Sequence, residues 1–256
     1  MSFCRFAILP LCFLFACGQQ NQVPGSAQNS QAPIVAELDS LPQVWYDMQP
    51  AEIELGGGEG TSTDTTRNFY FILDGSGSMG QEPDKDCGGD GSFRTKMAGA
   101  VWALERFMEQ VPEDVNIGLL TFDKHGISEK ITLGQGNREA FLKEINDVNV
   151  GLGTPLAEAI ETGTNRLIKQ YKQQLGYGEY RLVVITDGEA KYIPRASIYA
   201  ARMGIPIYAI GLCVDEKHPL RQFSVSYRAA NDFDALASGL QETLAELPTF
   251  DVTEFQ

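Results

Sequence analysis

The stretch FYFILDGSGSMG, residues 69–80, decides the fold of this chain. Its first five residues are all apolar, as is typical of a strand that is covered on both faces. The strand leads directly into Asp74 and a loop that is rich in glycine and serine. Glycines let a backbone turn sharply and approach a ligand closely. The stretch therefore predicts a buried strand that delivers one carboxylate and two hydroxyls into a single loop.

Strands and helices alternate on the C-terminal side of this stretch. We expect strands at 115–122, 127–133, 182–186, 205–212 and 224–229, and helices at 97–111, 141–148, 156–167, 193–203 and 236–247. Such alternation predicts an α/β fold, doubly wound, with a mostly parallel six-stranded sheet and helices on both faces. The turn at 123–126 makes residues 127–133 the hairpin partner of the preceding strand, and thus one antiparallel edge strand.

Two further loops carry oxygen side chains to the same end of the sheet. The loop at 151–156 offers Thr154 at a helix start, and the strand that ends at Thr186 leads directly into Asp187. Ligands of open α/β sheets bind at the carboxyl ends of the strands. Two carboxylates and three hydroxyls would therefore converge there as an all-oxygen site. Hard divalent cations suit such a site, Mg²⁺ first and Mn²⁺ second.

The residues of these three loops resemble a known metal site. Asp74-x-Ser76-x-Ser78, together with Thr154 and Asp187, is similar to the metal-ion-dependent adhesion site (MIDAS) of von Willebrand factor A (VWA) domains. The resemblance implies that the two serines bind the metal directly, and that the threonine does so in the open state. The two aspartates would act largely through waters. A carboxylate from a protein partner would complete the metal shell.

The resemblance covers residues 66–247, which leaves a tail at 248–256. It implies a VWA fold with Rossmann-like strand order, and a last helix that shifts with the state of the metal site. The predicted function is a divalent-metal-dependent protein-binding or adhesion module that is not an enzyme and has no small-molecule substrate. Two alternatives stay open: a metal-independent scaffold or sensor subunit of an envelope complex, and a metal-assisted hydrolase.

The hydrolase and a nucleotide-binding role are both disfavoured by the residues. A serine hydrolase of the G-x-S-x-G type needs an elbow that the sequence lacks. The only histidines, His125 and His218, are expected at the surface. The glycines at 75, 77 and 80 match a dinucleotide fingerprint, but Asp74 would then lie beside the pyrophosphate.

The N-terminus is predicted to be a targeting segment, residues 1–16. The apolar run at 6–16 is too short to span a bilayer but suits a secretory signal. The residues LFACG at 14–18 resemble a bacterial lipobox, which implies cleavage before Cys17 and lipid attachment to it. Gly18 is not the aspartate that retains such proteins at the inner membrane, so the resemblance implies an outer-membrane lipoprotein facing the periplasm or the cell surface. Plain secretion is the alternative.

Composition agrees with one secreted domain on a tether. Residues 17–65 are predicted to form that tether, because residues 18–40 are rich in Gln, Asn, Ser, Pro and Ala. The chain has 256 residues, 43% of them apolar, and a net charge of -14. This acidity argues against nucleic acid and anionic lipid as partners, so that contact with the membrane is expected through the lipid alone.

Two cysteines remain after the targeting segment is removed. Cys4 and Cys12 lie within it, and Cys17 would carry lipid. Cys87 and Cys213 are therefore left as an even pair in an oxidising compartment, which predicts one disulfide between them.

Overall fold

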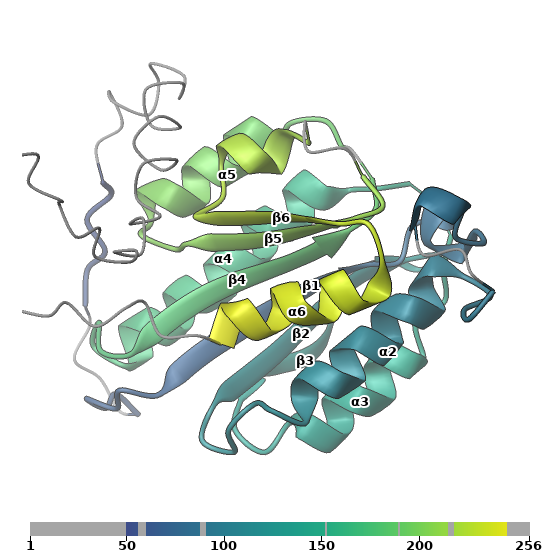
Figure 1. Ribbon diagram of the computed structural model, residues 1–256. Coiled ribbons are helices and arrows are strands. Elements are labelled where there is room, and N and C mark those ends of the chain that lie inside the picture. Colours follow the sequence, from purple (N-terminus) through teal and green to yellow (C-terminus); the bar gives the residue numbers. More distant parts are fainter. Residues whose placement is uncertain are drawn as a thin grey trace, which may run out of the picture. The chain divides into compact units, whose positions relative to one another are not determined.

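The computed structural model describes residues 50–55, 60–87, 91–151, 153–188, 190–214 and 218–244. A six-stranded sheet forms its centre, with the order β3-β2-β1-β4-β5-β6 (Figure 1). The strands are β1 (Arg67–Asp74), β2 (Asn116–Asp123), β3 (Gly126–Gly134), β4 (Glu179–Thr186), β5 (Ile207–Leu212) and β6 (Ser226–Ala230). Only the β2–β3 pair is antiparallel, and it forms one edge of the sheet. The predicted fold class is confirmed.

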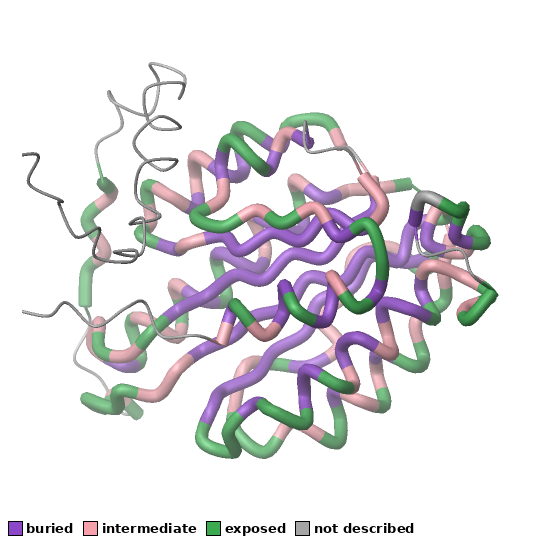
Figure 2. Tube along the Cα trace, in the orientation of Figure 1, coloured by how far each residue is buried: buried purple, intermediate pink, exposed green. Residues whose placement is uncertain are grey.

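Helices cover both faces of the sheet. The longer ones are α2 (Lys96–Met108), α3 (Arg138–Asn146), α4 (Leu156–Gln173), α5 (Ile193–Arg202) and α6 (Phe233–Leu244). Three short 3₁₀ turns are η2 (Gly77–Gly80), η3 (Lys85–Cys87) and η4 (Pro219–Gln222). Residues of α2, α3 and α6 share one apolar core with one face of the sheet, and residues of α4 and α5 share a second core with the other face. The central strands between these cores are buried (Figure 2).

The strand order places a topological switch point between β1 and β4. β1 pairs in parallel with β2 on one side and with β4 on the other. The connections that leave β1 and β4 therefore run to opposite sides of the sheet. The carboxyl ends of neighbouring strands at such a switch point form the usual binding crevice of an open α/β sheet. Asp74 is the last residue of β1, and Asp187 directly follows β4.

The end of the predicted tether contacts the domain at the end of the sheet opposite to Asp74 and Asp187. The Ala51 amide donates to the Arg202 carbonyl at 2.8 Å, and the Ser62 amide donates to the Gln173 carbonyl at 2.9 Å. These bonds attach residues near 51 and 62 to the C-terminal ends of α5 and α4. The predicted signal and Cys17 lie outside the described residues. Among those that are described, no helix combines the length and apolar character needed to cross a bilayer.

Candidate metal site

Asp74 ties the serine-rich loop to the end of β4. One carboxylate oxygen, Oδ1, accepts a hydrogen bond from the Ser76 amide at 2.8 Å, and Oδ2 accepts one from the Thr186 hydroxyl at 2.6 Å. The side chain is fully buried. Burial raises the pKa of Asp74, and the hydrogen bonds from Ser76 and Thr186 act in the opposite direction. Both carboxylate oxygens are thus used to hold the loop in place.

The two serines and Asp187 form a continuous chain of oxygen atoms. Ser76 Oγ lies 3.1 Å from Ser78 Oγ, and the Ser78 hydroxyl donates to Asp187 Oδ1 at 2.7 Å. Ser76 and Asp187 are buried, whereas Ser78 is half-exposed. The site therefore opens to solvent on the side of Ser78.

Thr154 reaches the same place from the loop before α4. This loop is held to the serine loop by the Gly151 amide, which donates to the Gly75 carbonyl at 2.9 Å. The Thr154 hydroxyl oxygen lies 3.6 Å from the position that a Cβ would take at Gly188, directly after Asp187. All five residues of the predicted site are thus gathered at the carboxyl ends of β1 and β4.

The geometry of these oxygens fits a small hard cation. In an octahedral Mg²⁺ shell with ligands at about 2.1 Å, neighbouring oxygens are about 3 Å apart. The 3.1 Å separation of the Ser76 and Ser78 hydroxyls matches that spacing. Within the part of the chain that the structure describes, no group of three or more His, Cys, Asp and Glu residues could hold a metal ion. A cation at this site would therefore depend on hydroxyl ligands as well as carboxylates.

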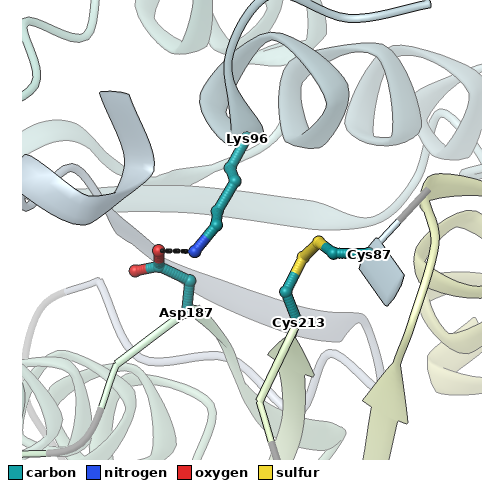
Figure 3. Close-up of a disulfide and its surroundings, with 4 residues drawn as sticks. All are labelled: Cys87, Lys96, Asp187 and Cys213. Atoms are coloured by element: carbon teal, nitrogen blue, oxygen red, sulfur yellow. Dashed lines mark hydrogen bonds and ion pairs between the residues drawn. A yellow bond between two sulfur atoms is a disulfide. The ribbon is translucent and has the colours of Figure 1, made fainter. Parts of the chain in front are cut away.

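Lys96 is an unpredicted member of the site. Figure 3 shows its ammonium directed at the Asp187 carboxylate. The distance from Nζ to Asp187 Oδ2 is 3.0 Å. The Asp187 side chain has no exposed surface, and that of Lys96 is 15% exposed. Together with the Ser78 hydroxyl on Oδ1, this ion pair gives each Asp187 oxygen a partner.

His218 supports the loop after β4 and is buried, so its predicted place at the surface is wrong. Its Nδ1 accepts from the Leu220 amide at 3.2 Å, and its Nε2 lies 3.0 Å from the Gly188 carbonyl. Because Nδ1 is an acceptor, the neutral ring carries its proton on Nε2 and donates it to Gly188. The ring also stacks on Tyr227. His125 is exposed, as predicted.

Substitution His218→Ala is expected to lower the free energy of unfolding by about 1–3 kcal/mol, because it removes the acceptor of the Leu220 amide and one of two donors to the Gly188 carbonyl. Thermal unfolding in EDTA measures this. The matched control is His125→Ala, which should change the stability by less than about 0.5 kcal/mol. Equal stability of the two variants would contradict a supporting role for His218.

The cysteines at 87 and 213 are joined as a disulfide, with their Cα atoms 5.2 Å apart (Figure 3). Cys87 ends η3, and Cys213 directly follows β5. The bond thus connects the loop between β1 and α2 to the carboxyl end of β5. This is the edge of the sheet that carries the candidate metal site.

Residues 68–243 match the von Willebrand factor type A domain, and the chain belongs to this family. No curated protein matches the chain by sequence.

Solved structures with the same fold include bacterial surface proteins. The pilus adhesin SpaC from Lactobacillus rhamnosus GG is 14% identical with a TM-score of 0.54, and the match covers 72% of this chain and 31% of SpaC. A von Willebrand factor type A protein from Catenulispora acidiphila is 16% identical (TM-score 0.51; 70% and 42% covered). The PilB minor pilin from Streptococcus sanguinis, as a D319A mutant, is 12% identical (TM-score 0.51; 70% and 61% covered). The chain therefore spans less than two thirds of each of these proteins.

Proposed function

We propose that this chain is a divalent-metal-dependent protein-binding module that grips an Asp or Glu carboxylate of a partner protein. Mg²⁺, or Mn²⁺ in its place, would be held by Asp74, Ser76, Ser78, Thr154 and Asp187. One observation carries the proposal: the serine hydroxyls and Asp187 form a chain of oxygens with spacings of 3.1 and 2.7 Å. This row of oxygen atoms lies at the switch point of the sheet and is open to solvent.

The bound metal would supply a Lewis acid for the partner's carboxylate. The chain's own residues hold these oxygens in position. Asp74 fixes the serine loop, and Gly151 attaches the Thr154 loop to it. Hydroxyl ligands carry no charge, so they leave the metal electrophilic toward an external anion. The acidic chain, with its net charge of -14, suits a partner whose remaining surface is basic.

We place this role in binding rather than in catalysis. Both ring nitrogens of His218 contact backbone groups, so this histidine does not act as a base for Ser76 or Ser78. The module would be tethered to the bacterial envelope by lipid on Cys17. The lipobox-like residues at 14–18 support this part of the proposal. An adhesive or assembly role at the envelope agrees with that location.

The second candidate is a metal-independent scaffold or sensor, and one observation favours it. The Lys96 ammonium lies 3.0 Å from Asp187 Oδ2, so a cation of the chain's own can balance the charge of this carboxylate. A scaffold of this kind would keep its fold and its partner in EDTA, whereas the proposed module would lose the partner.

We expect millimolar Mg²⁺ to raise the unfolding temperature of the full-length chain relative to EDTA, and Asp74→Asn and Asp187→Asn to abolish that gain. A ligand at 100 times its dissociation constant stabilises the fold by about 2.7 kcal/mol. Asp123→Asn is the matched control, since Asp123 is a buried aspartate at the end of β2 outside the proposed ligand set. This variant should keep the full response to Mg²⁺.

The same Asp74→Asn variant should be at least as stable as the wild type in EDTA. Burial raises the pKa of Asp74, so its ionised form costs stability above that pKa, and the neutral amide removes this cost. The Thr186 hydroxyl can then donate to the Gly188 carbonyl, which lies 3.2 Å away.

A wild type whose unfolding temperature does not respond to Mg²⁺ would contradict the proposed metal site. A response that survives in both Asp74→Asn and Asp187→Asn would also contradict it.

A further inference from the structure

Lys96 lies at a position that is electrostatically unfavourable for a cation. It is the first residue of α2, where the helix dipole is positive. The first turn of α2 contains no acidic residue that would offset this charge, and the Lys96 side chain is only 15% exposed. Its ion pair with Asp187 at 3.0 Å is what stabilises the ammonium there.

The partner of Lys96 is a proposed metal ligand, so the two cations compete for one carboxylate. With Asp74 and Asp187 ionised, the two carboxylates and the ammonium sum to a charge of -1 rather than -2. A divalent ion that approaches Asp187 therefore meets a weaker field than the two aspartates alone would provide. It must also displace the ammonium from Oδ2 or bind beside it.

We propose that Lys96 is a built-in competing cation that sets the metal affinity of this site and keeps it low. The inference rests on the proposed metal-binding function. In the absence of metal, Lys96 satisfies the buried Asp187 carboxylate, which would otherwise be a costly unpaired charge. When metal binds, the ammonium adds repulsion that weakens the binding. Lys96 is thus a residue that determines affinity without being a ligand.

The test compares Mn²⁺ binding to the full-length chain and its variants by isothermal titration calorimetry, with Mn²⁺ alone as the probe. Lys96→Met keeps the length of the aliphatic stem and removes the charge. We expect it to bind Mn²⁺ about tenfold or more tightly than the wild type does. Lys96→Arg, which keeps the charge, should stay within about threefold of the wild type.

Lys191→Met is the control for general charge removal, because Lys191 is an exposed lysine four residues after Asp187. It should also stay within about threefold of the wild type. Thermal unfolding in EDTA establishes that each variant is folded, and Lys96→Gln replaces the methionine variant if that one is not.

The outcomes separate this inference from the function on which it rests. If the wild type binds Mn²⁺ and Lys96→Met binds it equally or more weakly, the competing role of Lys96 is overturned and the metal site stands. If neither the wild type nor any Lys96 variant binds Mn²⁺, the metal site itself is overturned. Binding by Lys96→Met together with undetectable binding by the wild type would be the strongest support.

Discussion

Reduction of the Cys87–Cys213 disulfide is expected to lower the free energy of unfolding by about 3–5 kcal/mol. The two cysteines are 126 residues apart, and closing a loop of that length restricts the unfolded chain by about 5 kcal/mol in the chain-entropy description. In the folded state the bond joins the loop before α2 to the end of β5. Urea unfolding of the full-length chain, with and without a reducing agent, measures the difference.

The double variant Cys87→Ser/Cys213→Ser is the matched control for reduction. It should unfold like the reduced wild type and should not respond to the reducing agent, which excludes effects of the reductant elsewhere. Mass spectrometry of the unreduced protein tests the bond directly, because a disulfide lowers the mass by two hydrogens. Free thiols at both positions, together with identical urea curves, would show that the bond does not form.

The fold was predictable because its strongest signals are local. The apolar run at 69–73 lies entirely within β1 and is fully buried, and Asp74 ends the strand as expected. The observed strands and helices differ from the predicted ones at their ends. The strand expected from 205 begins at Ile207, since Pro206 has no amide hydrogen to offer to a ladder. The last helix begins at Phe233, earlier than the apolar stripe at 236–247 indicates.

The five residues of the candidate site could be predicted because each lies at the end of a strand or in a polar loop next to a strand end or a helix start. The supporting residues could not. Thr186 reads only as the last residue of a buried strand, yet its hydroxyl contacts Asp74. His218 lies 31 positions after Asp187, and its contact with the Gly188 carbonyl depends on how the chain returns. The one available signal for Lys96 was a cation in the first turn of a helix, where it is unfavourable.

Gly99 allows α6 to pack closely on α2. A Cβ at this position would lie 2.1, 2.2 and 2.4 Å from three ring atoms of Phe233, the first residue of α6. The Phe233 ring cannot easily move aside, because it also packs edge-to-face on Phe93 with ring centroids 4.7 Å apart. Since α2 also begins with Lys96, this contact connects the position of α6 to the helix that reaches the candidate metal site.

Gly99→Leu is therefore expected to lower the free energy of unfolding by about 3 kcal/mol or more, because the side chain has no space. Helix propensity acts in the opposite direction by about 1 kcal/mol and does not offset the clash. Ala98→Leu is the matched control, since it adds the same side chain one residue earlier at an exposed position of α2. It should change the stability by less than about 0.5 kcal/mol.

A double-mutant cycle identifies Phe233 as the cause of the clash. Phe233→Ala alone should cost about 3–4 kcal/mol through the cavity that it leaves. In the Gly99→Leu/Phe233→Ala variant the new leucine can occupy part of that cavity. The loss of stability should then be smaller than the sum of the two single losses by at least about 1 kcal/mol. Strictly additive losses would mean that the leucine is accommodated elsewhere, and that the close approach of α6 to α2 does not depend on this glycine.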